Sequence, residues 1–343
     1  MSTQISIFIP VYNDARWLAG AIDSVRGQGH QDWEIVVGDN VSTDGVEDVL
    51  AGYDDPRIRY HRWQAHVPID ENFNRTASLA RYRWVQLLCA DDRLRPGCLE
   101  RIVEAIESHP AAGGRLAMVL TACRRVDEQG NSADHIWYGT KPKLAVASGT
   151  YDAADWFAIH TRDGHPPWNV GSVAVAREVI EESGGFFRPE VGLSCDVELS
   201  LRAAAYGEVR YIDEPLLDFT VRPDADSSVR LWMNRHNDDD RTPIEVALLA
   251  GLSVHRHRRE VSDAEQRRVR RAISRSHLQR AAQHRVLEGG KGRRGALRDV
   301  VAAVRWDWRT VVRPYQLAYA LAAIVLPAGV LDVARRRISA RPR

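Results

Sequence analysis

The sequence predicts a doubly wound α/β domain over residues 1–228, followed by a separate helical, arginine-rich extension over residues 229–343. In the first part, short β-branched apolar runs alternate with amphipathic helical segments, which is typical of parallel crossover units. The charge also changes sign between the parts. Residues 1–228 carry 22 Lys/Arg and 35 Asp/Glu, whereas residues 229–343 carry 25 and 11. We therefore expect the two parts to face different partners.

The apolar runs predict the strands of the α/β domain. In the first half they lie at 5–11, 33–37, 58–62, 84–89 and 115–122. The helix after the first strand is expected to be capped by Asn13 and Asp14. In doubly wound sheets, ligands bind beyond the carboxyl ends of the strands. Asp39, Asp91 and Asp92 follow predicted strands and are expected there.

The pattern becomes mixed after residue 148. It predicts a strand at 170–176, a glycine loop at 184–185, a helix at 197–206 and a strand at 209–212. In the extension, Ser262 and Glu265 form the S-x-x-E pattern of a capping box. They are expected to open a helix that runs towards residue 289.

Several patterns that define other function classes are absent from the sequence. No GxGxxG follows the first strand and no GxxxxGK[ST] occurs, so nicotinamide-dinucleotide and P-loop interpretations lose their main support. The four cysteines lie far apart without a CxxC pair, which indicates reduced thiols rather than a zinc site or disulfides. The N-terminus lacks the basic and long apolar regions of a secretory signal, so we expect a cytoplasmic protein.

Two adjacent carboxylates, Asp91 and Asp92, follow the apolar strand at 84–89. Crowding two negative charges at a buried strand end is costly unless a cation compensates. Mg²⁺ and Mn²⁺ take one or two protein carboxylates together with phosphate oxygens. The strand context therefore favours a divalent-cation and nucleotide-diphosphate site. A structural turn is the alternative, because adjacent carboxylates are usually just solvated turns.

Four segments, together with Asn74, carry a resemblance to a known family. They are S-I-F-I-P-V-Y-N-D at 6–14, V-V-G-D-N-x-S-T-D-G at 36–45, L-L-C-A-D-D-R-L-R-P at 87–96 and C-D-V-E-L-S-L-R at 195–202. Because these segments occur in this order along the chain, the sequence resembles the family 2 glycosyltransferases over about residues 4–222. The resemblance implies a GT-A fold, a Rossmann-like mixed sheet flanked by helices. It also implies a nucleotide-binding half at 1–122, an acceptor half at 123–228, and inverting sugar transfer from a nucleotide diphosphate donor.

The resemblance also implies roles for individual residues. The nucleotide site would be formed by Pro10, Val11, Tyr12, Asp39, Asn74 and Asp91. Asp39 would hydrogen-bond the base, with a strand-end cap as the alternative, Asp91 would face the ribose, and Asp92 would hold the divalent cation, Mn²⁺ or Mg²⁺.

Asp196 matches the family's general base, and an attacking acceptor hydroxyl must indeed lose a proton as the diphosphate leaves. Its alternative role is that of N-cap of the helix at 197–206, and the two roles can coexist. Glu198 is the reserve candidate for the base. On the acceptor side, Trp168 offers a flat face for a sugar, with core packing as the alternative.

Two positions depart from the family's pattern. Cys89 stands where the family often has an acidic residue, and Arg222 stands where it often has a histidine near the metal. An arginine cannot ligate a cation, but it can neutralise a diphosphate directly. The sequence therefore leaves open a weaker or different metal dependence.

An uncharged run at 314–331 lies between Arg305, Arg309 and Arg313 on one side and the arginines at 335–337 on the other. It is borderline for a membrane span, which needs about 20 predominantly apolar residues. We expect it instead to bind the anionic inner face of the cell membrane peripherally. Packing against the catalytic domain or a partner in a homodimer is the alternative.

Two other functions compete with sugar transfer. A nucleotidyltransferase acting on sugar phosphates shares the layout, but its G-x-G-x-R loop is absent. A nucleic-acid binder could use the basic segment at 285–298, yet no aromatic-interleaved or base-reading motif accompanies it. The sequence therefore favours transfer to a glycan or lipid-linked acceptor, in cell-surface polysaccharide synthesis and without nucleic acid.

Overall fold

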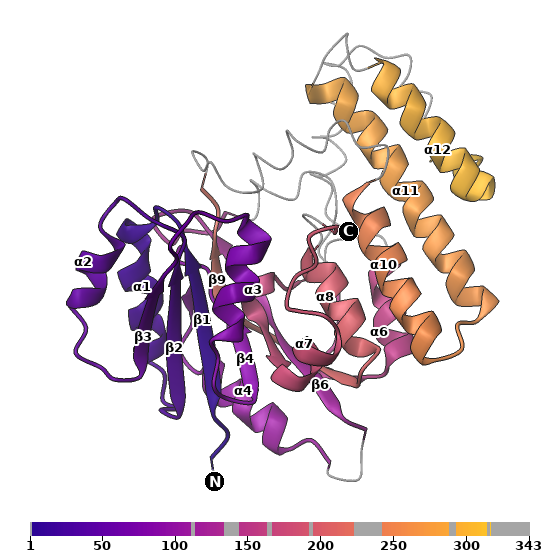
Figure 1. Ribbon diagram of the computed structural model, residues 1–343. Coiled ribbons are helices and arrows are strands. Elements are labelled where there is room, and N and C mark those ends of the chain that lie inside the picture. The colour runs from indigo at the N-terminus through magenta and orange to yellow at the C-terminus, as the bar shows by residue number, and fades with distance from the viewer. Residues whose placement is uncertain are drawn as a thin grey trace.

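The computed structural model describes residues 2–110, 114–133, 144–162, 167–191, 195–222, 242–287, 293–313 and 316. Within these residues, nine strands form one mixed sheet (Figure 1). The strands are β1 (Ile5–Val11), β2 (Trp33–Asp39), β3 (Ile58–Arg62), β4 (Trp84–Leu87), β5 (Arg93–Leu94), β6 (Leu116–Val126), β7 (Gly149–Tyr151), β8 (Val173–Ala176) and β9 (Glu208–Thr220).

The sheet has the order β3-β2-β1-β4-β8-β6-β9-β5, with β7 paired to β9. Strands β1 to β4 are parallel to their neighbours among themselves. Strand β8 runs antiparallel between β4 and β6, whereas β9 is parallel to β6. Because β8 is flanked by two strands of the opposite direction, β6 and β9 run the same way as β1. The carboxyl ends of β1, β2, β4 and β9 therefore lie at one edge of the sheet.

The helices flank this sheet and extend beyond it on one side (Figure 1). They are α1 (Ala15–Arg26), α2 (Val46–Ala51), α3 (Ile69–Ser78), α4 (Cys98–Glu107), α6 (Ala153–His160), α7 (Arg177–Glu182), α8 (Cys195–Ala204), α10 (Pro243–Arg258), α11 (Asp263–Leu287) and α12 (Arg293–Val311), with a 3₁₀ turn at Val170–Ser172.

The central strands are buried on both faces, which explains why they are continuous apolar runs in the sequence. Every residue of β1 and of β2 is buried. Strands β1 and β3 have the predicted bounds, but β6 and β9 are longer than predicted. Charged residues in the later halves of β6 and β9 interrupt the apolar pattern, so the sequence does not reveal that these strands continue. Arg124 of β6 pairs with Asp218 of β9 across the sheet at 2.8 Å, so both charges are matched.

The helical extension shares a hydrophobic core with the α/β part, although the sequence predicted a separate module. Leu248 and Leu252 of α10 and Ile273 of α11 are buried in one cluster with Phe157 of α6 and Leu201 of α8. This cluster places α10 and α11 beside α6 and α8 (Figure 1).

The predicted capping box opens α11. The backbone N–H of Glu265 donates to Ser262 Oγ at 3.3 Å, and the N–H of Ser262 donates to Glu265 Oε2 at 3.0 Å. None of the helices in the described part of the chain is both long and apolar enough to cross a membrane. Apart from residue 316, the uncharged run at 314–331 lies outside the described residues.

Candidate active site

The edge where β1, β2, β4 and β9 end gathers most of the charged residues that the sequence predicted for the site. Asp39 is the last residue of β2, and Asp91 and Asp92 follow β4. Arg222 lies two residues after the end of β9. Parallel strand direction, rather than closeness in sequence, brings these side chains together.

Asp92 is completely buried and only half satisfied. Its Oδ1 accepts a hydrogen bond from the backbone N–H of Thr220 at 2.9 Å. Its Oδ2 is buried and has no hydrogen-bond partner among the described residues. Burial raises the pKa of Asp92 well above its usual value, and the charge of Asp91 adds to the effect. The burial of Asp92 therefore favours a positive ligand or a proton at Oδ2.

Arg222 joins two carboxylates across this edge. Its Nε lies 2.9 Å from Asp91 Oδ2, and its Nη1 donates to Asp14 Oδ1 at 2.7 Å. Burial raises the pKa of Asp91, and the charge of Arg222 opposes that rise. Asp14 is the N-cap residue of α1, as predicted, but its side chain makes no capping hydrogen bond and pairs with Arg222 instead. Asp44 replaces it, since its Oδ2 accepts the N–H of Ala15 at 2.8 Å.

Cys89 completes a compact group with the two aspartates. The potential ligand atoms of Cys89, Asp91 and Asp92 all lie within 4.8 Å of one another. Burial and the neighbouring carboxylates raise the pKa of the Cys89 thiol well above its usual value, so the thiol stays protonated. Only thiolates bind metals strongly, so the carboxylate oxygens are the potential ligands of this group.

Asp39 is buried and accepts three hydrogen bonds. The donors are Ser42 N–H at 2.8 Å, Tyr60 Oη at 2.8 Å and Arg62 Nη1 at 2.7 Å. Sequence reasoning missed Tyr60 and Arg62. A signal was available, because parallel pairing of β2 with β3 sets Asp39 opposite Arg62.

The loops after β1 and β2 are fastened to each other and are strained. Asn13 and Val41 both have positive φ angles, 52° and 67°. This conformation is unusual for a β-branched residue such as Val41. Ser42 Oγ accepts the N–H of Asn13 at 3.0 Å, and Asn13 Oδ1 accepts the N–H of Thr43 at 2.8 Å. Such strain concentrates at functional sites.

The predicted base pocket begins with a buried segment and ends in an exposed ring. Pro10 and Val11 are buried within β1, whereas Tyr12 is 48% exposed. The ring of Tyr12 meets His66 edge-on, with 4.7 Å between ring centroids. Of the three, Tyr12 is therefore the residue open to a ligand.

Asp196 lies in the first turn of α8 and is half-buried. It is the second residue of that helix rather than the residue before it, and its Oδ1 accepts the N–H of Val197 at 2.7 Å. Burial raises its pKa to about 6. Cys195 contributes to the raised pKa of Cys89, which places the start of α8 beside the acidic group after β4.

Glu198, the reserve candidate for the base, belongs to a buried ion pair. Its Oε1 lies 2.9 Å from Nε of Arg202, and both side chains are buried. Arg202 also donates to the carbonyls of Gly185 at 2.9 Å and Phe186 at 2.8 Å. This pair holds the glycine loop against α8. The i,i+4 spacing of Glu198 and Arg202 was the available sequence signal.

Two predicted site residues have their polar or aromatic groups engaged inside the protein. The side-chain amide of Asn74 donates to the carbonyl of Phe187 and accepts its N–H, both at 2.8 Å. Trp168 is 2% exposed and stacks on Trp156, with 4.9 Å between centroids. The burial of Trp168 favours core packing over sugar stacking.

Comparison with known proteins identifies the domain. Residues 6–152 match the family described as Glycosyl transferase family 2. The uncharacterised protein y4gI of Sinorhizobium fredii is 38% identical over 112 residues, which cover 32% of this chain and 12% of that protein. The succinoglycan biosynthesis protein ExoO of Rhizobium meliloti is 31% identical over 120 residues, which cover 33% of this chain and 32% of ExoO. The matches thus span about a third or less of these relatives.

A solved structure extends the likeness over the whole fold. S. aureus TarS 1-349 in complex with UDP superposes with a TM-score of 0.61 at 15% sequence identity, covering 98% of this chain and 92% of that chain. A structure of the same protein in complex with UDP-GlcNAc gives a TM-score of 0.55 at 14% identity, covering 90% and 92%. The predicted GT-A fold class with C-terminal helices is confirmed by this likeness. Over residues 6–152 the chain therefore matches the family 2 glycosyltransferases, and its fold is that of TarS.

Proposed function

We propose that this protein transfers a sugar from a nucleotide diphosphate donor to a hydroxyl of a glycan or lipid-linked acceptor, with inversion and with the help of a divalent cation. The donor class is supported by TarS, whose structures contain UDP and UDP-GlcNAc. A role in polysaccharide synthesis is supported by ExoO, which is named for succinoglycan biosynthesis. The residues at the sheet edge supply the chemical argument.

The single observation that carries the proposal is the buried Oδ2 of Asp92, which has no hydrogen-bond partner in the described part of the chain. A buried carboxylate oxygen without a donor is costly, and a hard divalent cation removes that cost. The donor set fits such a cation, because Asp92 and Asp91 offer oxygens and the Cys89 thiol stays protonated. A bound Mg²⁺ or Mn²⁺ would neutralise charge on the leaving diphosphate.

The chain's own residues support the other parts of the reaction. Asp196 accepts the proton of the acceptor hydroxyl as that oxygen attacks the anomeric carbon and the bond to the diphosphate breaks. A pKa of about 6 keeps Asp196 mostly ionised at neutral pH while making it a better proton acceptor than an ordinary aspartate. Arg222 balances the negative charges of Asp14 and Asp91, and its guanidinium can also bind a phosphate oxygen.

Substituting Asp92 tests the donor site. Asp92→Asn keeps the shape of the side chain and an oxygen that can accept the N–H of Thr220, so the fold should persist. We expect it to lose most of the gain in donor affinity that Mn²⁺ gives, on the order of tenfold or more. Titration calorimetry with UDP-, GDP- and dTDP-sugars, with Mn²⁺ and with excess chelator, measures this gain.

A matched control is Asp55→Asn, which changes a carboxylate of a half-exposed ion pair with Arg57. It should leave the effect of Mn²⁺ unchanged. If Asp92→Asn retains the full effect of Mn²⁺ on donor affinity, the cation is not held by Asp92. If no nucleotide sugar binds to the wild-type protein, the proposed function fails.

We further propose that α12 lies on an anionic membrane surface. Leu297, Val301 and Val304 follow one face of α12 and are 44 to 52% exposed, and Trp308 is 57% exposed. Exposed apolar side chains flanked by arginines are typical of interfacial helices, and each arginine near the headgroups contributes about 1 kcal/mol.

The membrane proposal is tested by vesicle sedimentation. The double substitution Val301→Glu and Val304→Glu should release the protein from phosphatidylglycerol vesicles and leave donor binding intact. Phosphatidylcholine vesicles control for the charge requirement. If the wild-type protein is instead a dimer that the same substitutions split, this face of α12 is a dimer contact.

A further inference from the structure

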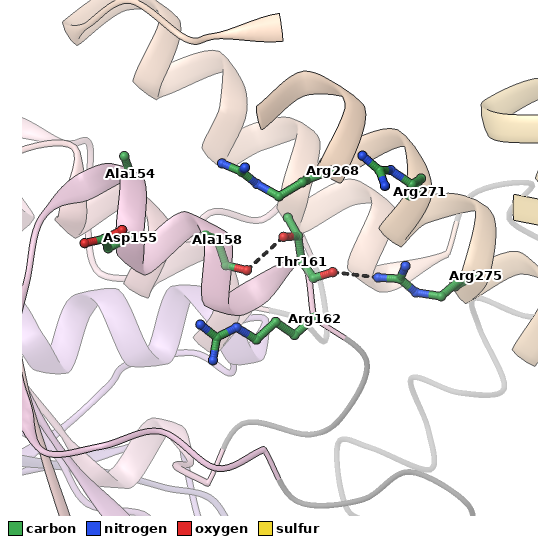
Figure 2. Close-up of a pocket in the computed structure, with 8 residues that line it drawn as sticks. All are labelled: Ala154, Asp155, Ala158, Thr161, Arg162, Arg268, Arg271 and Arg275. Atoms are coloured by element: carbon green, nitrogen blue, oxygen red, sulfur yellow. Dashed lines mark hydrogen bonds between the residues drawn. The ribbon is translucent and has the colours of Figure 1, made fainter. Parts of the chain in front are cut away.

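We propose that a pocket between α6 and α11 is a second, phosphate-binding site, for a phosphate group that does not belong to the sugar donor. Figure 2 shows the pocket, with α6 on one side and a row of arginines from α11 on the other. Its volume is about 350 Å³, and its lining is Ala154, Asp155, Ala158, Thr161, Arg162, Arg268, Arg271 and Arg275.

The charged residues that line the pocket are mostly positive. Arg268, Arg271 and Arg275 occur at i, i+3 and i+7 along α11, so they project from one face of that helix. Arg162 adds a fourth positive charge just after α6, and Asp155 is the single carboxylate in the lining. No ion pair joins Arg162, Arg268 or Arg271 to a carboxylate within the described part of the chain. The lining of the pocket therefore has an excess of positive charge.

The hydrogen bonding of the arginines leaves one buried donor available. Arg275 Nη2 donates to the carbonyl of Thr161 at 2.6 Å, which fastens α11 to the end of α6 (Figure 2). Arg271 Nε donates to the carbonyl of Arg267 at 3.3 Å. Arg268 Nε is buried and has no acceptor among the residues that the structure describes. A buried N–H without an acceptor is costly, so an anionic oxygen at this position would be stabilised.

Phosphate fits this pocket better than a carboxylate does. A guanidinium binds phosphate through two parallel N–H···O bonds, and several arginines can share the oxygens of one group. The three arginines other than Arg275, set against Asp155, leave a net charge of +2 in the lining, which matches the charge of about −2 of a phosphate better than the single charge of a carboxylate. A volume of about 350 Å³ also leaves room for the group that bears the phosphate.

The helix α6, which lines the pocket, is hydrogen-bonded to the helix α8 of the candidate active site. His160 of α6 and Ser200 of α8 are joined by a hydrogen bond of 2.9 Å between Nε2 and Oγ. The same helix α8 carries Asp196 in its first turn. Two kinds of ligand carry a phosphate group that fits this pocket. One is a soluble phosphorylated molecule, and the other is an anionic lipid, through its headgroup.

The test compares two adjacent arginines of α11 in the full chain. Arg268→Gln removes one of the positive charges that line the pocket. Arg267→Gln removes a positive charge from an exposed position outside the lining. Titration calorimetry with glycerol phosphate and with inorganic phosphate measures the affinity for soluble phosphates. Sedimentation with phosphatidylglycerol vesicles measures binding to an anionic lipid. Melting temperature and donor affinity confirm that both variants are folded.

We expect Arg268→Gln to weaken the binding of phosphate probes by about tenfold or more, and Arg267→Gln to change it less than about twofold. If Arg268→Gln alone also releases the protein from vesicles, the ligand is a lipid headgroup. If vesicle binding is unchanged while the phosphate probes are lost, it is a soluble phosphorylated molecule. Equal losses in both variants, or no binding of any phosphate probe or vesicle by the wild-type protein, would overturn the site. Donor binding is independent of these outcomes.

Discussion

Two carboxylates, Asp92 and Asp196, differ in their partners from the buried carboxylates of the helical extension. In the extension, Asp299 lies 2.7 Å from His277 Nδ1 and also pairs with Arg280, and Glu245 lies 2.7 Å from His277 Nε2. At the sheet edge, Asp92 has one oxygen without a partner among the described residues, and Asp196 accepts a bond from the backbone of Val197.

This difference distinguishes carboxylates that stabilise the fold from carboxylates that are retained for function. A buried charge with matched partners rigidifies a structure, whereas one without them costs free energy and is retained for another reason. The α8 helix contains both kinds within three residues, because Glu198 is paired with Arg202, whereas no ion pair joins Asp196 to a cation among the residues that the structure describes. We therefore infer that Asp196 is placed for chemistry and Glu198 for structure, and substitutions can break or sharpen that contrast.

The largest expected effect follows from Asp196→Asn. This change removes the proton acceptor and keeps the size of the side chain, so sugar transfer should fall about 10²- to 10⁴-fold. Donor affinity and melting temperature should stay close to wild type. Because the pKa of Asp196 is about 6, wild-type transfer should fall as the pH drops below about 6, where the carboxyl is protonated. Transfer rates from pH 4.5 to 8 measure both effects.

Glu198→Gln is the contrasting variant on the same helix. It leaves the buried guanidinium of Arg202 without its carboxylate, so stability should fall by about 3–5 kcal/mol. The transfer rate per folded molecule should change little. Should Asp196→Asn retain transfer while Glu198→Gln loses it without unfolding, the base is Glu198 and the contrast is wrong.

Much of the fold was predictable because burial on both faces leaves a direct mark on the sequence. Strand β1 was predicted with its bounds, since each of its residues is buried. Strand β9 was predicted at 209–212 but runs from Glu208 to Thr220. Its later part contains Asp213, Glu214 and Pro215, which resemble a loop in the sequence. Pairing with β6 on one side and β5 on the other keeps that segment extended.

The site was predictable in its positions but not in its partners. Strand ends and the family's motifs located Asp39, Asp92 and Asp196. The pairing of Arg222 with Asp14 joins residues 208 positions apart, so local patterns carry no sign of it. The same holds for the burial of Trp168, which depends on Trp156 and other aromatic residues brought together by the fold.

The smallest expected effect is a pH dependence of the extension's buried cluster. Burial lowers the pKa of His277, but the hydrogen bonds and charges of Asp299 and Glu245 raise it by more, so the net pKa lies above the usual value. A histidine whose folded pKa is raised contributes stability that is fully present below the unfolded pKa of about 6.5. That stability is lost as the pH rises through the folded pKa. Each unit of the shift corresponds to about 1.4 kcal/mol.

His277→Gln should therefore be less stable than the wild-type protein at pH 5.5, and the difference should narrow towards pH 9. Measuring the difference between the two proteins cancels the opposite trend of His160, whose pKa burial lowers to about 4. His257→Gln, at an exposed histidine of α10, should leave the wild-type pH profile unchanged. Urea denaturation at pH 5.5, 7 and 9 gives the free energies of unfolding. A stability gap between wild type and His277→Gln that stays constant across these pH values would show that folding does not raise the pKa of His277, and a gap that widens towards pH 9 would show that His277 is neutral in the folded protein. Glu245 would then lack the charged partner that distinguishes it from Asp92 at the sheet edge.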